Sequence, residues 1–199
     1  MKKGLWIVLG LIAAVLAIGF LSFGGIYNGL VQREEAVESA WAQVENVYQR
    51  RADLVPNLVN TVKGFAAQER EVLQNVVEAR SKVSQVNLNA SEIVNDPAAL
   101  QRFQELQGQL SSALSRLLVT VERYPELKSS QNFLALQQQL EGTENRITVE
   151  RMRFNEAAQS FNTYRRQFPN VFLANLMGFK EKAYFEADEG SDAAPTVEF

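Results

Sequence analysis

The stretch Val37–Phe65, VESAWAQVENVYQRRADLVPNLVNTVKGF, decides the fold that the sequence predicts. Apolar side chains recur in it at alternating steps of three and four residues, and the repeat continues downstream. Such a repeat keeps one stripe of a helix facing a partner helix, as in supercoiled bundles. We therefore predict a coiled-coil-like helical bundle. The apolar positions of the repeat are Val37, Trp41, Val44, Tyr48, Val55, Leu58, Val62, Phe65, Val72, Val76, Ala79, Val83 and Val86.

Charged residues occupy two positions of this repeat, Arg51 and Glu69, and Glu150 interrupts the stripe of the last predicted helix. A buried charge needs a partner, because an unpaired one costs several kcal/mol. We interpret the three residues as polar seam positions that fix register and helix pairing. The alternative is exposure at a helix edge. Catalysis or ion binding is disfavoured, because no second carboxylate cluster accompanies them.

Pro56 lies within the repeat and leaves two interpretations open. Proline removes a helical hydrogen bond and disfavours helical geometry in the preceding residue, so it either kinks or ends a helix. The apolar repeat favours a kinked continuation, whereas the proline favours a boundary.

Turn-forming residues separate the helices that follow. Residues 87–97 (NLNASEIVNDP) predict a loop in which Asp96 caps the next helix and the adjoining proline takes its first position. We expect long helices over 97–124 and 131–168, the second capped by a preceding serine. A short apolar helix is then expected up to Gly178.

Sustained alternation at period two, which would indicate strands, is missing from the sequence. The predicted fold is all-α, with an N-terminal single transmembrane helix followed by an antiparallel bundle of three to four long helices with a short C-terminal helix. We expect an anchor over residues 1–27, a helical bundle domain over 28–187 and a disordered acidic tail over 188–199 (DEGSDAAPTVEF).

The predicted anchor is the uncharged run from Gly4 to Ile26. About 20 apolar residues in a helix cross the roughly 30 Å hydrocarbon layer of a bilayer. A cleaved signal peptide is the alternative, but the run exceeds the core length of such a peptide. Lys2 and Lys3 precede the run, so the positive-inside rule favours a cytoplasmic N-terminus and an exported bundle. We expect this anchor to cross the membrane in a single pass.

Small residues in the anchor are spaced for helix association. Gly10 and Ala14, and likewise Ala13 and Ala17, lie four positions apart. Such pairs let two helices approach closely in lipid. They are the candidate association face of a homo-oligomer.

Composition excludes several kinds of chemistry. The chain has no cysteine and no histidine, which removes disulfides, thiol nucleophiles, histidine bases and the usual transition-metal sites. Its 20 basic and 23 acidic residues are well mixed, so no basic block predicts nucleic-acid binding. We expect no enzyme activity, no cofactor and no metal.

Two long motifs resemble the LemA family of bacterial membrane proteins. The first lies within residues 26–83 and includes RRADLVPNLV, and the second lies within residues 153–187 and includes FPNVFLANLMGF. Gln68 departs from the family pattern, in which a histidine often precedes the glutamate. The resemblance implies a helical bundle tethered to the bacterial plasma membrane, and it implies no catalytic activity.

The leading functional hypothesis is therefore a non-enzymatic scaffold. It self-associates or holds a membrane protein partner close to the lipid bilayer, since helical seams readily extend to further helices. The alternative is an accessory or sensor domain that regulates another membrane protein, such as a protease or transporter.

Overall fold

The computed structural model describes residues 2–85 and 90–186, apart from the side chains of residues 2–5, 8, 12–22, 90 and 91. Every regular element in the described residues is a helix, which confirms the all-α prediction. The helices are α1 (Lys2–Phe65), α2 (Arg70–Gln85), α3 (Ala90–Asn95), α4 (Pro97–Val121), α5 (Pro125–Lys128), α6 (Gln131–Arg166) and α7 (Asn170–Leu176).

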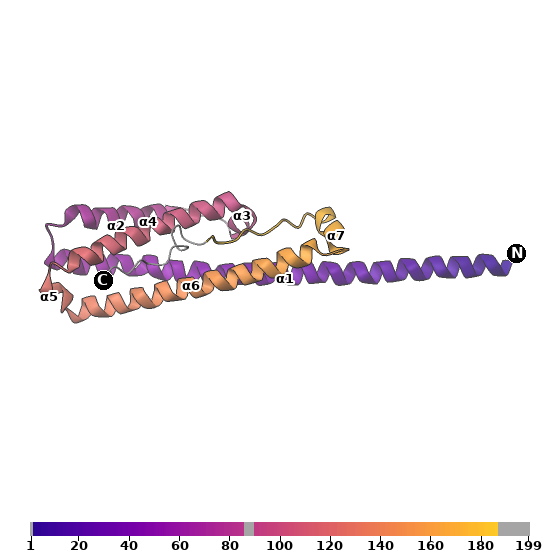
Figure 1. The fold of residues 1–199 in the computed structure, drawn as a ribbon, viewed down its shortest axis with the longest axis horizontal. Coiled ribbons are helices and arrows are strands. Elements are labelled where there is room, and N and C mark those ends of the chain that lie inside the picture. The colour runs from indigo at the N-terminus through magenta and orange to yellow at the C-terminus, as the bar shows by residue number, and fades with distance from the viewer. Residues whose placement is uncertain (1, 86–89, 187–199) are drawn as a thin grey trace, which may run out of the picture.

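The bundle is an elongated rod built along α1 (Figure 1). α6 packs beside α1 over a long distance, and α2 and α4 form a second pair against them. The first part of α1 projects beyond the other helices, and α7 lies at the end of the bundle from which it projects. The short turn element α5 lies at the opposite end.

α1 continues through Pro56 and ends at Phe65, so the proline is not a boundary. Pro56 is tolerated because the residues around it keep the apolar stripe buried, with Val55 1% and Leu58 2% exposed. The repeat breaks ten residues later instead: Phe65 is 48% exposed, and the backbone turns before α2 begins.

The turn between α1 and α2 corrects the expectation of a continuous repeat. Gly64 has a low helix propensity and lies in the last turn of α1. Ala66 is fully buried and donates its N–H to the Val62 carbonyl at 2.8 Å, after which the Glu69 N–H donates to the Ala66 carbonyl at 3.1 Å. These bonds close the reversal that brings α2 back along α1.

The predicted loop before α4 contains a short helix, α3, which the sequence pattern did not indicate. Its Ile93 and Val94 are buried, so hydrophobic packing against the core orders this segment. The predicted cap is confirmed: the Asp96 side chain accepts a hydrogen bond from the Ala98 N–H at 2.9 Å, and Pro97 is the first residue of α4.

The last long helix ends two residues earlier than predicted, at Arg166. Phe168 therefore lies outside α6, with 82% of its surface exposed. Ser130 occupies the N-cap position of α6, but its side chain makes no capping hydrogen bond. The short apolar helix expected before Gly178 is present as α7.

Two hydrophobic clusters follow one another along the rod. We call the part around the first cluster the aromatic half and the part around the second the aliphatic half. Buried members of the aromatic half include Leu30, Val37, Trp41, Val44, Tyr48, Ile147, Phe154, Phe161 and Phe185. Buried members of the aliphatic half include Val55, Leu58, Val62, Leu73, Val76, Leu110, Leu114, Leu117, Val121 and Leu140.

The membrane anchor stays a prediction. Among the residues that the structure describes, no helix combines the length and the apolar character that a membrane crossing requires. Most side chains of the predicted anchor, including those of residues 12–22, lie outside the described residues, as does the predicted tail at 188–199.

Candidate functional site

Arg51 lies at the junction between the aromatic and aliphatic halves and is only 2% exposed. Its Nη1 donates to the Ser111 Oγ at 2.7 Å and forms an ion pair with the Glu144 Oε1 at 3.0 Å. Its Nη2 donates to the Gln107 carbonyl at 3.2 Å and to the Gln107 side chain. One guanidinium from α1 therefore bonds both α4 and α6.

Side chains of the protein itself surround the Arg51 guanidinium. The Arg51 guanidinium also lies over the Tyr48 ring, 5.1 Å from the ring centroid. Within residues 2–85 and 90–186, its Nε has no hydrogen-bond partner. The sequence identified Arg51 but not Glu144, because the pairing depends on the relative register of two helices that are far apart in the chain. Its role in fixing that register remains a prediction.

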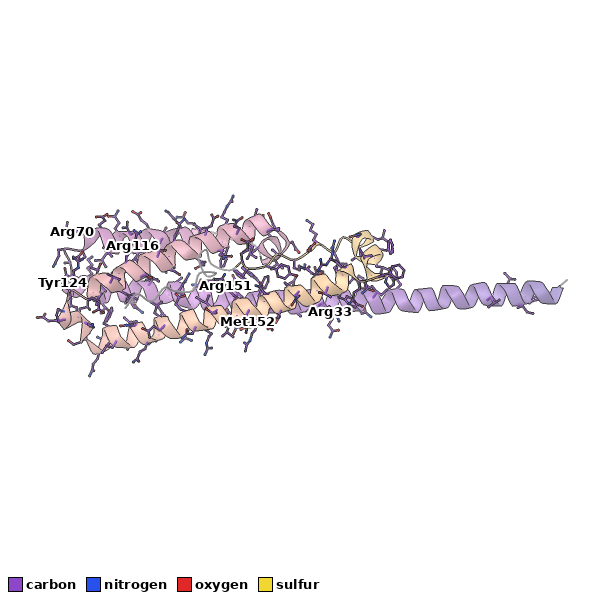
Figure 2. The ribbon with its side chains drawn as sticks, in the orientation of Figure 1. Arg33, Arg70, Arg116, Tyr124, Arg151 and Met152 are labelled. Atoms are coloured by element: carbon purple, nitrogen blue, oxygen red, sulfur yellow. The ribbon has the colours of Figure 1, made fainter. Side chains whose placement is uncertain are left out.

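Glu69 lies in the turn before α2 rather than in a helix seam. Its Oε1 accepts a hydrogen bond from the Tyr124 hydroxyl at 2.8 Å and pairs with Arg123 at 3.1 Å. Gln68 donates to the same Tyr124 hydroxyl at 2.9 Å. Figure 2 places Tyr124 at the end of the rod opposite to α7. Glu69 therefore joins the α1–α2 turn to the end of α4.

The hydrogen bond to the Glu69 carboxylate raises the pKa of Tyr124 above its ordinary value, because the bond requires the phenol to keep its proton. Desolvation and the negative charge of Glu69 act in the same direction, while Gln68 and Arg123 oppose the rise in pKa.

The other predicted positions are not brought together. Glu150 is largely buried, and among the described residues its ion pair is with Arg153 of its own helix, at 2.9 Å. Gly10 is exposed, and a Cβ atom at this position would meet no atom within 4 Å. The side chains of Ala13, Ala14 and Ala17 lie outside the described residues. The association face therefore stays a prediction.

A polar cluster that the sequence did not reveal is centred on Lys182. This lysine is 2% exposed, and its Nζ donates to the Glu34 Oε1 at 2.6 Å and to the Asn95 Oδ1 at 2.7 Å. It also lies 4.9 Å from the Phe161 ring centroid. Lys182 belongs to an extended segment, residues 179–186, which we call the strap. It ties the strap to α1 and α3.

Asparagine side chains of α6 hold the strap backbone. Asn162 is fully buried: its Nδ2 donates to the Lys182 carbonyl, and its Oδ1 accepts from the Lys182 N–H, both at 2.8 Å. Asn155 makes the same pair of bonds to Phe185, at 3.0 and 2.9 Å. The sequence signal that could have identified these two asparagines is their spacing of seven residues. It places both on one face of α6.

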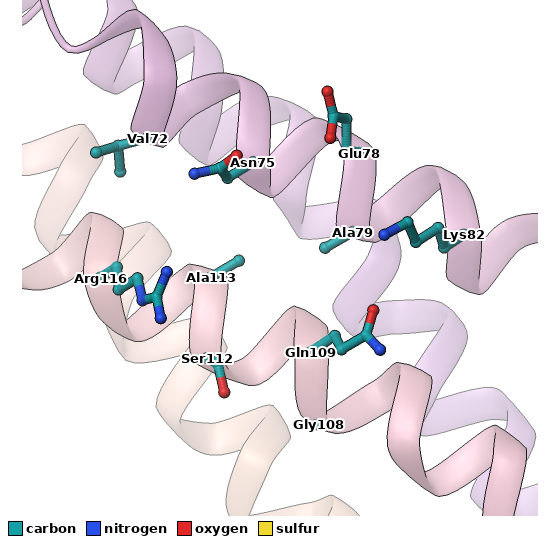
Figure 3. Close-up of a pocket in the computed structure, with 10 residues that line it drawn as sticks. All are labelled: Val72, Asn75, Glu78, Ala79, Lys82, Gly108, Gln109, Ser112, Ala113 and Arg116. Atoms are coloured by element: carbon teal, nitrogen blue, oxygen red, sulfur yellow. The ribbon is translucent and has the colours of Figure 1, made fainter.

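A groove of about 500 Å³ lies between α2 and α4 in the aliphatic half (Figure 3). Small residues line it, among them Ala79, Gly108, Ser112 and Ala113, while charged side chains of both signs lie along its edges. Glu78 supplies the negative charge, and Lys82 and Arg116 supply the positive charges. Such a surface suits the close approach of another helix better than the enclosure of a small molecule.

Metal-binding chemistry finds no support in the described part of the chain, where no three acidic, histidine or cysteine side chains converge on one point. The polar clusters consist of ion pairs and hydrogen bonds that join helices, the turn before α2 and the strap. Their arrangement can hold elements of the fold together.

Comparison with known proteins supports the family resemblance. The chain is 26% identical to the magnetosome protein MamQ of Magnetospirillum gryphiswaldense, over 92% of this chain and 75% of that protein. It is 25% identical to the magnetosome protein MamQ 2 of Paramagnetospirillum magneticum, over 83% of this chain and 66% of that one. It is also 25% identical to Protein LemA of Metamycoplasma hominis, over 88% of this chain and 76% of that one.

The model of the LemA family matches residues 40–199, a range that includes both signature motifs, the Arg51 cluster, the groove and the strap. This match covers most of the sequence. The chain belongs to the LemA family.

Proposed function

We propose that this chain is a membrane-tethered, non-catalytic scaffold that self-associates through the groove between α2 and α4 at the bacterial plasma membrane. The tether is the apolar run Gly4–Ile26, which α1 continues without a break into both halves of the bundle. A continuous helix transmits the position of its anchored end to the rest of the rod. The lack of histidine and cysteine in the sequence supports a non-catalytic role.

The groove is the observation that carries this proposal. Its floor is made of small side chains, with Ala79 and Ala113 each less than 10% exposed, so a helix can approach the backbone closely. Glu78 and Lys82 place both charge signs on the α2 edge, and Arg116 adds a positive charge on the α4 edge. A surface with both charge signs can be complementary to a second copy of itself across a two-fold axis.

Two glycines give a matched test of the groove. Gly108 lines the groove, whereas Gly142 lies exposed on α6, and a Cβ atom at either position meets no atom within 4 Å. Gly108→Trp fills the groove, and Gly142→Trp adds the same bulk elsewhere. The measurement is the molar mass of the full chain, extracted from membranes with a mild detergent, by light scattering after size exclusion.

We expect an oligomer for the unmodified chain and for Gly142→Trp, and a smaller species for Gly108→Trp. A monomeric unmodified chain would contradict self-association. A monomer that co-purifies in fixed stoichiometry with another membrane protein would favour the accessory or sensor role instead. Recovery of the full chain without detergent would contradict the tether.

The names of the relatives do not identify a partner for this chain. Two of them are magnetosome proteins by name, but Protein LemA of Metamycoplasma hominis is equally similar and carries no such name.

A further inference from the structure

The helix α7 has its large apolar side chains on the outside. Asn170 and Ala174, one turn apart, are the residues that it buries, at 6% and 0% exposure. Phe172 and Leu176, also one turn apart, are 66% and 78% exposed. A surface helix normally buries its large apolar residues, so this inverted arrangement requires an explanation.

These side chains form one surface with their neighbours. Phe168 is 82% and Met177 is 46% exposed, and the Phe168 and Phe172 rings meet edge to face, with their centroids 5.9 Å apart. We call Phe168, Phe172, Leu176 and Met177 the outer patch. In the part of the chain that the structure describes, these four side chains stay 46–82% exposed.

The outer patch lies where α1 leaves the bundle. Phe179, just after α7, packs against Tyr27 with ring centroids 6.0 Å apart. Near the end of α6, Tyr164 contacts α1 at Gly29 and lies under the Arg33 guanidinium, 3.9 Å from its ring centroid. Figure 1 shows α7 beside α1 at the start of the projecting part. The patch is therefore level with the last residues of the apolar run, which ends at Ile26.

Charge around the patch favours a lipid surface. The segment from Thr163 to Lys180 contains Arg165, Arg166 and Lys180 and no acidic residue. Short apolar segments that carry aromatic rings and basic flanks settle at the boundary between headgroups and acyl chains. Anionic headgroups at a bilayer surface attract such flanks.

We propose that the outer patch inserts into the bilayer interface beside α1 and forms a second membrane contact of the chain. This inference rests on the proposed tether, because α1 brings the patch to the membrane. A second contact on one side of α1 fixes the tilt and rotation of the rod relative to the bilayer. A single spanning helix leaves that rotation free.

The absence of cysteine allows the inference to be tested with single nitroxide labels on the full chain in nanodiscs of phosphatidylcholine and phosphatidylglycerol. Labels are placed by Met177→Cys in the patch, Leu11→Cys in the apolar run and Val119→Cys on α4. Leu11 and Val119 are 63% and 71% exposed. The readout is the collision rate with oxygen relative to a water-soluble nickel chelate.

We expect the ratio at positions 177 and 11 to be several-fold higher than at position 119. Adding Phe172→Glu should lower the ratio at 177 to that at 119 and leave position 11 unchanged. The matched variant Val119→Glu, in the chain labelled at 177, should change nothing.

The possible failures are distinguishable. A label at 11 in lipid with a label at 177 in water overturns this inference and leaves the tether intact. A label at 177 shielded from both reagents overturns it in favour of a protein partner or a second copy. Labels at both positions in water contradict the tether itself, and the inference with it.

Discussion

The aromatic and aliphatic halves of the bundle share α1, α4 and α6 but are held together differently. In the aromatic half, Trp41 contacts the rings of Phe103, Phe154 and Phe185 at centroid distances of 5.4–6.1 Å. Phe185 belongs to the strap, which hydrogen bonds from the side-chain amides of Asn155 and Asn162 fasten to α6. The aliphatic half is built largely from Val, Leu and Ala, has no strap and carries the groove.

The difference suggests a division of labour. Large rings bury more area per residue and pack in defined geometries, which resists rearrangement. Aliphatic helix seams with small residues at the surface adapt more readily to an added helix. We infer that the aromatic half is the rigid base next to α7, and that the aliphatic half is the part that receives other helices. We expect Arg51, at the junction, to keep the two halves in register, which remains a prediction.

Removing the central ring of the aromatic half should have the largest effect. Trp41→Ala should lower the free energy of unfolding by about 4 kcal/mol, because it leaves a large cavity among three other rings. Leu117→Ala in the aliphatic half should cost about 3 kcal/mol, since the smaller cavity can collapse in part. Chemical denaturation followed by circular dichroism measures both. A larger loss for Leu117→Ala would contradict the contrast between the halves.

Arg51→Leu should lower the free energy of unfolding, because it removes the contacts that Arg51 makes at the junction of the two halves. We expect a loss of about 2–3 kcal/mol, below the usual cost of breaking a buried pair because Glu144 is 39% exposed and can be hydrated. The neighbouring Arg50 is exposed, so Arg50→Leu should change the unfolding free energy by less than about 0.5 kcal/mol. Equal melting curves for the two variants would show that the Arg51 cluster adds nothing.

Asn162→Ala should release the strap. The substitution leaves the Lys182 N–H and carbonyl groups without partners in a buried place, at a cost of about 2 kcal/mol. Limited proteolysis should then cut within residues 179–186, and the exposed control Asn145→Ala should remain resistant there. Equal resistance in both variants would mean that Asn162 does not fasten the strap.

Glycine substitutions should have opposite signs in the two halves. A Cβ at Gly29 would lie 2.7 Å from the Tyr164 Cζ, so Gly29→Ala should destabilise the aromatic half by about 1 kcal/mol. A Cβ at Gly108 meets nothing, so Gly108→Ala should stabilise its helix by about 0.5–1 kcal/mol. Thermal unfolding of the two variants gives the comparison. Stabilisation by both substitutions would show that packing is equally loose at both sites.

The smallest effect is expected at the tip of the aliphatic half, from Tyr124→Phe. The pKa of Tyr124 is raised in the folded chain, so its hydrogen bond to Glu69 stabilises the fold fully below the pKa of the unfolded chain, about 10. This stabilisation is lost as the pH rises through the pKa of the folded chain. The variant should therefore melt slightly below the unmodified chain at pH 8. The two melting temperatures should converge at strongly alkaline pH. A difference that persists there would assign the effect to packing alone.

Local patterns predicted much of this architecture. The apolar repeat up to Val62 and the cap at Asp96 depend on residues close in sequence, and the structure confirms both. The position where α1 ends was not predictable from Pro56, because burial on both sides of the proline outweighs its local cost.

The polar clusters depend on contacts that no local pattern encodes. Lys182 meets Glu34 across 148 positions, and Arg51 meets Glu144 across 93. Sequence reasoning identified Arg51 because a charge inside an apolar repeat is conspicuous. It missed Lys182 because the strap has no regular secondary structure and therefore no periodicity.

The claim that one half is rigid and the other adaptable is tested most directly by native-state hydrogen exchange of the full chain in nanodiscs. We predict that amides of residues 30–48 and 150–162, in the aromatic half, exchange more slowly than those of α2 and of α4 beside the groove. Amides of α2 that exchange as slowly as those around Trp41 would contradict the account.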